Sequence, residues 1–260
     1  MTIFVFCFII FAIAAIMTMT GRGGGNFYVL ALALAGIGMH EAATTGQFIL
    51  VVSSLTATLF FARRRVTDWK LILIIGSMTI VSAFLGGFFS DVFQGKALKI
   101  IFAVFITIAS FLMLKPVKER NTNKKRYQIN VQSGDQVYPL NLFVIIPAVL
   151  LTGFISGMVG ISGGSFLVPL MVLAIGVPMH IAVGTSTALV MFTASAGFLG
   201  HLSTGHFDAA LAIPLALSGA VGAFVGTRLT IGFNPKKLKI IFAATSFLAA
   251  IIMVVKVFYS

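Results

Sequence analysis

Two glycine clusters contain the residues of this chain best suited to chemistry. They read Gly21-Arg22-Gly23-Gly24-Gly25-Asn26 and Gly160-Ile161-Ser162-Gly163-Gly164-Ser165. Each glycine inside a helix costs about 1 kcal/mol relative to alanine, so each cluster predicts a break followed by the start of a new helix. A helix N-terminus presents N–H groups and a positive dipole end, and both favour an anion. The chemistry that these clusters predict is therefore anion binding by the backbone.

Polar side chains within the clusters could add to such a site. Arg22 is the one cation bracketed by glycines and apolar segments, and its guanidinium suits an oxyanion with several acceptor oxygens. Asn26 and Ser165 stand where an N-cap residue would accept a hydrogen bond from the new helix. Two alternatives stay open: the glycines could merely permit close helix crossing, and Arg22 could lie at an outer water interface.

A second polar stretch follows each cluster, Thr44-Thr45-Gly46-Gln47 in the first half and Gly184-Thr185-Ser186-Thr187 in the second. Their hydroxyl and amide groups could line the same cavity as donors, although serine and threonine in membrane helices often bond only to their own helix. The candidate substrate-binding residues are thus Arg22, Gly23, Gly24, Gly25, Asn26, Thr44, Thr45, Gln47, Gly163, Gly164, Ser165, Thr185 and Ser186.

Enzymatic and metal chemistry are not indicated. No Ser/His/Asp order, His-Glu-x-x-His motif or paired carboxylates are visible, and the one cysteine, Cys7, excludes an intrachain disulfide and a thiol-based metal cluster. His201, His206 and Asp208 could pass for metal ligands, but we expect these histidines to be solvated in an outer turn. Asp68 and Asp208 each precede a helix, which predicts capping. We therefore expect no enzyme activity, no metal and no cofactor.

The composition predicts a multi-pass protein of the cell membrane, whose main partner is the lipid bilayer. The 260 residues are 59% hydrophobic and 9% charged, with a mean hydropathy of +1.09. A soluble domain of this size needs more polar surface. The net charge of +12 comes from lysine and arginine clustered in loops, as cytoplasmic loops of membrane proteins require, so we expect no nucleic-acid partner. Trp69 resembles an interfacial anchor.

The pattern of apolar runs predicts an all-α fold of five helical segments in each half, because the runs are too long for barrel strands and lack alternation. The second segment of each half is too short to cross a hydrocarbon core of about 30 Å. The expected segments are 2–20, 26–38, 42–62, 69–90 and 97–115, then 141–159, 165–177, 181–202, 208–231 and 237–258. The domains are a first membrane repeat (1–115), a polar linker (116–140) and a second membrane repeat (141–260).

The two halves are related by an internal repeat. Residues 98–103 recur letter for letter at 238–243, and Met39-His40 recurs as Met179-His180 at the same offset of 140. The turn at 63–70 is basic whereas its counterpart at 201–206 lacks lysine and arginine, so the charge bias changes sides between the repeats. This predicts an inverted-topology duplication with the glycine-broken short helices at the pseudo-two-fold. The positive-inside rule then makes the linker cytoplasmic and both termini extracytoplasmic.

The second glycine cluster also carries a family resemblance. The stretch from Gly153 to Pro169, with Ala182-Val183-Gly184-Thr185-Ser186, Gly200-His201, Gly205 and Asp208, resembles the signature of the TauE/SafE sulfite exporter family. The resemblance covers the whole chain and implies transport of sulfite or an organosulfonate such as sulfoacetate. The first repeat departs from it through Arg22, Asn26 and Thr44-Thr45-Gly46, and these departures bear on the choice of anion.

The residues and the resemblance together predict a secondary transporter that exports a small sulfur-containing anion by alternating access. The alternative is an integral-membrane subunit or enzyme without transport of its own, which would need a titratable or metal-binding constellation inside the membrane. The sequence leaves a homodimer, the coupling ion and the identity of the anion open.

Overall fold

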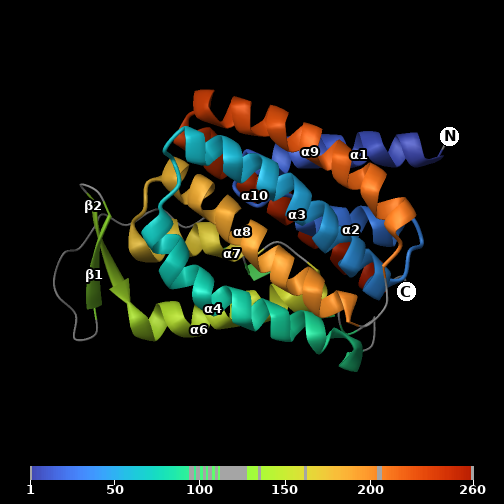
Figure 1. Cartoon of the computed structure of the whole chain (residues 1–260), viewed down its shortest axis with the longest axis horizontal. Helices are drawn as coiled ribbons and strands as arrows, with labels where there is room; N and C mark the ends of the chain where they lie inside the picture. The colour runs from blue at the N-terminus through green and yellow to red at the C-terminus, as the bar shows by residue number, and fades with distance from the viewer. Residues whose placement is uncertain are drawn as a thin grey trace.

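A bundle of long, closely packed helices forms the protein (Figure 1). The computed structural model describes residues 2–93, 97, 100–101, 104, 107–108, 111, 128–133, 136–160, 163–203 and 207–258. The elements of the first half are α1 (Thr2–Thr18), α2 (Gly25–Leu34), α3 (Met39–Arg63), α4 (Trp69–Phe88) and the single turn η1 (Ser90–Val92). Those that follow are β1 (Gln128–Ser133), β2 (Gln136–Asn141), α6 (Leu142–Val159), α7 (Gly164–Pro169), η2 (Leu170–Ile175), α8 (Met179–Leu202), α9 (Ala209–Gly232) and α10 (Pro235–Phe258).

The predicted all-α membrane fold is confirmed. In the described part of the chain, five helices are long and apolar enough to cross a membrane, namely α3, α4, α6, α8 and α9. Large apolar side chains cover the outside of the bundle: Phe4 is 77% exposed, Leu73 73% and Phe8 71%. Such a surface is compatible with a lipid environment and not with water. The predicted segment 97–115 lies for the most part outside the described residues; those described within it are helical.

The short second segments are confirmed as well. The helix α2 has ten residues, and α7 has six before it continues as the wider π-type turn η2. The change of helix type begins at Pro169, which has no N–H to donate to the preceding turn. At 1.5 Å per residue, neither segment is long enough to cross the hydrocarbon core.

A β-hairpin occupies part of the predicted linker, a feature that the all-helical interpretation missed. β1 and β2 pair antiparallel, with Ile129 opposite Leu140 and Val131 opposite Tyr138. Tyr138 and Leu140 are buried against the bundle. Apolar and polar residues alternate in β1, and in β2 the exposed Val137 is followed by the buried Tyr138, which is the ordinary pattern of a half-buried hairpin. The rest of the linker, residues 116–127 and 134–135, lies outside the described residues.

The two halves interlock through equivalent contacts. α4 packs along α6, and its counterpart α9 packs along α1. The close approach is made at glycine in both places: a Cβ atom at Gly86 would overlap the carbonyl oxygen of Phe154, and one at Gly226 would overlap that of Ala15. α3 and α8 pack against each other between these pairs. The core of the bundle is thus shared between the repeats.

The two ends of the bundle differ in the chain segments they carry (Figure 1). The α3–α4 turn, the hairpin and the α9–α10 turn lie at one end, while α1 begins and α10 finishes at the other. The first end is the basic one, since it holds Arg63, Arg64, Arg65 and Lys70 together with Lys236 and Lys237. The N-caps predicted for α4 and α9 are confirmed: Asp68 accepts from the amides of Lys70 and Leu71, and Asp208 from those of Ala210 and Leu211.

Candidate functional site

Both glycine clusters unwind the chain as predicted. The first break separates α1 from α2, and Gly21, Gly23 and Gly24 adopt positive φ values of 76°, 67° and 98° that favour glycine. The second break separates α6 from α7, and Gly160 ends α6 with a φ of 74°. The predicted capping residues were wrong, however.

The N-cap of α2 is Gly24 and that of α7 is Gly163, so Asn26 and Ser165 both lie inside their helices. Neither N-cap position provides a side-chain hydrogen bond. The first backbone N–H groups of a helix have no partner within the helix, so they need a side chain, water or a ligand as acceptor. The predicted caps, Asn26 and Ser165, are therefore not the N-cap residues of these helices.

The two breaks touch each other inside the bundle. A Cβ atom at Gly164 would lie 2.6 Å from the carbonyl oxygen of Gly21 and 2.9 Å from the Cα of Arg22. The Ser186 hydroxyl donates to the same Gly21 oxygen over 2.9 Å. From this contact, α2 and α7 extend towards opposite ends of the bundle (Figure 1). Gly21, Arg22, Gly164 and Ser186 therefore lie close together, although the first two belong to one half of the chain and the last two to the other.

The flanks of the breaks are packed in equivalent ways. A Cβ atom at Gly21 would lie 2.8 Å from the Cα of Val183 in α8, and one at Gly160 would lie 2.5 Å from the Cα of Ala43 in α3. Val183 and Ala43 occupy equivalent positions of the two repeats. Each break is thus held against the long central helix of the other half, and any added side chain would push the two apart.

Arg22 lies at the contact and is almost completely buried, with 1% of its surface exposed. Its Nη2 atom donates to the Thr245 hydroxyl over 2.6 Å and approaches the Met17 sulfur at 3.0 Å. The guanidinium stands 4.3 Å from the centre of the Phe242 ring, a cation–π distance. A cation held in so apolar a place is costly, and such residues in membrane proteins mark ion or substrate sites. The predicted outer-water alternative for Arg22 is therefore wrong.

The polar stretches divide into residues that bond locally and residues that do not. Thr44 donates to the carbonyl of His40 in its own helix, 2.9 Å away, which is the alternative that the sequence left open. Gln47 reaches across the bundle and donates from Nε2 to the Ser156 carbonyl over 3.1 Å. Its Oε1 atom and the Thr45 hydroxyl are buried and have no hydrogen-bond partner within the part of the chain that the structure describes.

Thr185 holds a contact between the two halves. Its hydroxyl accepts the backbone N–H of Asp68 over 2.9 Å, so α8 is tied to the α3–α4 turn. Gly184 lies next to it, and a Cβ atom there would overlap the carbonyl oxygen of Val66. We call this pair of contacts, at Thr185–Asp68 and Gly184–Val66, the first latch.

The structure corrects the expectation for His201. This residue lies within α8 and is fully buried, rather than solvated in an outer turn. Its Nε2 lies 2.7 Å from the Gly157 carbonyl oxygen and its Nδ1 3.1 Å from the Ser90 hydroxyl. Gly157 belongs to the last turn of α6, so His201 fixes the helix end just before the second break. The equivalent residue of the first repeat is the apolar Phe61, and this apolar counterpart was the sequence signal that position 201 is buried.

A second group around the first break had no clear signal in the sequence. The Tyr28 hydroxyl donates to Ser53 over 3.4 Å, and the Ser53 hydroxyl lies 3.5 Å from the Gly23 carbonyl oxygen. All three residues are buried. Tyr28 and Ser53 lie on different helices, α2 and α3, and their pairing follows only from how these helices pack.

A metal site would require the fold to bring metal-binding side chains together. The described residues contain no group of three or more histidine, cysteine, aspartate or glutamate side chains placed to hold a metal ion. His206, the second histidine of the predicted trio, lies outside the described residues.

Comparison with known proteins identifies the family of this chain. The sequence model described as sulfite exporter TauE/SafE matches residues 6–253, almost the entire chain. The chain belongs to the TauE/SafE family. The resemblance carried by the second glycine cluster is therefore confirmed, and membership makes this TauE/SafE protein a membrane-embedded, multi-pass transporter.

Relatives of this TauE/SafE protein are named as probable membrane transporter proteins. YunE of Bacillus subtilis is 28% identical over 202 residues, which cover 75% of this chain and 72% of YunE. MJ0441 of Methanocaldococcus jannaschii is 25% identical over 217 residues, which cover 80% of this chain and 76% of MJ0441. No solved structure matches the chain.

Proposed function

We propose that the protein is a secondary transporter that exports a small sulfur-containing oxyanion, sulfite or an organosulfonate such as sulfoacetate, through a site between the two glycine breaks. The observation that carries this proposal is the contact of Gly164 with Gly21 and Arg22, which brings the two glycine breaks together at a residue whose side chain is a buried cation. The sulfur-containing substrate class comes from the family, whereas the anionic character follows from the residues themselves.

The donors at the contact match such a substrate. A sulfonate or sulfite group carries several acceptor oxygens, and backbone N–H groups, hydroxyls and a guanidinium are all donors. Arg22, Gly23–Asn26, Gly163–Ser165, Thr45, Thr185 and Ser186 form the proposed donor set, together with the amide of Gln47. Thr44 is left out of this set, because its hydroxyl donates to the His40 carbonyl; the Ser186 hydroxyl would have to leave the Gly21 carbonyl to bind the anion.

Alternating access is supported by a difference between the halves. The contact equivalent to the Thr185–Asp68 hydrogen bond would join the Asp208 amide to the Thr45 hydroxyl. That bond is not formed in this structure: the Thr45 hydroxyl has no hydrogen-bond partner within the described chain. Asp208 is exposed, whereas Asp68 is only 8% exposed. We infer that the first latch closes the basic, cytoplasmic end in this conformation and that a second latch at Thr45–Asp208 closes the opposite end in the other.

The two latches are built from unequal residues. Thr44 stands where the first latch has Gly184. A side chain at this position prevents an approach as close as that of Gly184 to the Val66 carbonyl. We therefore expect the two end conformations to differ in stability, with the cytoplasm-closed one favoured in the absence of substrate.

Export requires no coupling ion on energetic grounds. A membrane potential that is negative inside favours the exit of an anion by about 2.3 kcal/mol per net charge for each 100 mV. This potential alone would sustain roughly a 50-fold gradient of a monovalent anion, because 1.4 kcal/mol corresponds to a factor of ten.

The test is efflux from proteoliposomes that contain the purified protein as their only protein. Vesicles are loaded with sulfite, sulfoacetate, sulfate, thiosulfate or acetate, and release is followed at several imposed potentials. We expect saturable release of sulfite or sulfoacetate that accelerates as the potential of the loaded side becomes more negative. If none of the five anions is released faster than from loaded vesicles without protein, the proposal is contradicted. That result would favour a subunit without transport of its own.

A further inference from the structure

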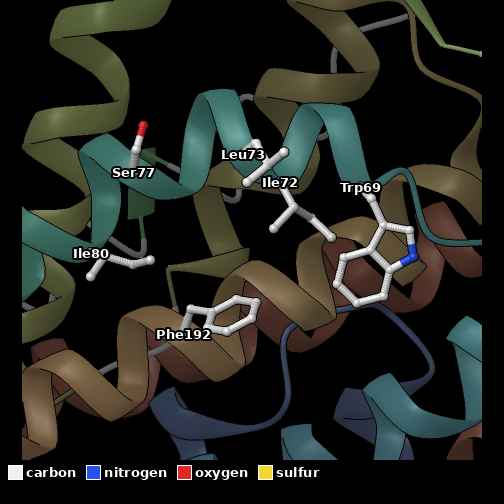
Figure 2. A pocket seen from close by; sticks show the side chains of 6 residues that line it. All are labelled: Trp69, Ile72, Leu73, Ser77, Ile80 and Phe192. Carbon is white, nitrogen blue, oxygen red and sulfur yellow. The ribbon is translucent and has the colours of Figure 1, made fainter.

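A groove on the lipid-facing side of the bundle runs between α4 and α8. It has a volume of about 460 Å³ and is lined by Trp69, Ile72, Leu73, Ser77, Ile80 and Phe192. Figure 2 shows Trp69, Ile72 and Ile80 on α4 above Phe192 on α8, with the Ser77 hydroxyl pointing away from α8. The groove therefore lies on the outside of the bundle and is lined by apolar side chains except for Ser77.

The length of the groove matches one leaflet of the membrane. Trp69 and Ile80 are eleven residues apart on α4, a distance of about 16 Å at 1.5 Å per residue. This is about half of a hydrocarbon core that measures roughly 30 Å. A single acyl chain, anchored at the interface and ending near the midplane, covers such a length.

A polar pocket continues the groove at the basic end of the bundle. Its volume is about 320 Å³, and its lining includes Arg65, Thr67, Lys70 and Tyr138 as well as Trp69, which it shares with the groove. The Thr67 hydroxyl oxygen is buried without a hydrogen-bond partner within the described chain. The pocket therefore offers a hydroxyl and two cations where the apolar groove reaches the membrane surface.

The charge around this pocket is strongly positive. Arg63 and Arg64 lie exposed in the same turn as Arg65 and Lys70. The one carboxylate in the pocket, Asp68, is engaged by the amides of Lys70 and Leu71. Lys70 also donates to the Gln132 carbonyl of the hairpin, which holds its ammonium group at the pocket. Juxtamembrane clusters of this kind attract anionic lipid headgroups.

We propose that the groove and the pocket together bind one anionic phospholipid, with an acyl chain between α4 and α8 and its phosphate at Arg65 and Lys70. The Thr67 hydroxyl donates to a headgroup oxygen, and the Trp69 ring lies at the boundary between headgroup and chain. The site is separate from the glycine breaks, so the proposal stands independently of the transported anion.

Native mass spectrometry of the full chain tests the proposal, with phosphatidylglycerol and phosphatidylcholine of identical acyl chains as probes. Each cation near an anionic surface contributes about 1 kcal/mol, so the double variant Arg65→Gln/Lys70→Gln should weaken phosphatidylglycerol binding about 30-fold. Binding of phosphatidylcholine should change little. The variant Lys236→Gln/Lys237→Gln removes the same charge from exposed residues at the same end of the bundle and should leave both affinities unchanged.

Three outcomes would overturn the proposal. Equal losses in the two double variants would show attraction by net charge and not a site. Displacement of bound lipid by soluble glycerol phosphate at equal concentration would show that the acyl groove contributes nothing. A dimer whose interface covers Phe192 and which binds no lipid would assign the groove to a second copy of the chain.

Discussion

Replacing threonine by valine at three buried positions should change stability in three different ways. Thr185, Thr187 and Thr45 are all fully buried, and valine keeps their shape while removing the hydroxyl. Thr185→Val leaves the Asp68 N–H without its acceptor, and an unsatisfied buried donor costs about 1–3 kcal/mol. Thr187 donates only to the Val183 carbonyl of its own helix, so Thr187→Val is the matched control and should cost less than about 1 kcal/mol.

Thr45→Val should stabilise the conformation seen here. Its hydroxyl is buried without a partner in the described chain, and burial of such a group costs about 1–3 kcal/mol. We therefore expect Thr45→Val and Thr185→Val to differ by at least about 2 kcal/mol in the free energy of unfolding. The same Thr45 variant should slow transport, because it removes the proposed second latch that the opposite conformation needs.

The assay is unfolding in mixed micelles with increasing SDS, followed by intrinsic fluorescence. The single tryptophan, Trp69, is adjacent to Asp68 and reports on the turn that Thr185 holds. Equal losses of stability for Thr185→Val and Thr187→Val would refute the first latch. A loss of stability for Thr45→Val as large as that for Thr185→Val would refute the inferred asymmetry between the halves.

Three further predictions concern the site itself. Arg22→Gln should weaken the apparent affinity for the exported anion about 10- to 100-fold in proteoliposome efflux, because a charge-assisted hydrogen bond contributes about 1.5–3 kcal/mol; an unchanged affinity would remove Arg22 from the site. Gly164→Ala should destabilise the protein by about 1–3 kcal/mol in SDS unfolding through its overlap with Gly21 and Arg22, while Gly232→Ala, at a helix end with open space around it, should not; equal effects would argue against a close contact of the breaks. His201→Phe should cost about 1–3 kcal/mol in the same assay, because the Gly157 carbonyl and the Ser90 hydroxyl lose a buried partner, and a neutral effect would show that these groups find water instead.

The sequence predicted the parts of the fold that depend on local composition. Runs of apolar residues defined the membrane-crossing helices, and consecutive glycines defined the two breaks, because both effects act within a few residues of the chain. Asp68 and Asp208 were predicted as caps for the same reason. The N-caps of α2 and α7 were predicted wrongly, because a glycine stands at the position that a polar side chain occupies more often. At α2 this residue, Gly24, adopts a positive φ that favours glycine.

The features that the sequence did not predict depend on contacts between distant segments. His201 resembled a loop histidine by its neighbours, yet α8 extends far enough to bury it against Gly157. The hairpin at Gln128–Asn141 is stabilised by burial of Tyr138 and Leu140 against the bundle, which a polar linker composition does not reveal. The Thr185–Asp68 bond joins residues 117 positions apart, so only the packing of the two repeats creates it.

The most direct measurement of the central claim is the position of a bound anion. Selenite has the shape and charge type of sulfite, and its selenium atom can be located by anomalous scattering in crystals of the protein. Binding between the glycine breaks predicts one peak within hydrogen-bond distance of the Arg22 guanidinium or the backbone N–H groups of Gly24–Asn26 and Gly164–Ser165. A peak elsewhere in the bundle, or none at a selenite concentration that inhibits efflux, would contradict the account.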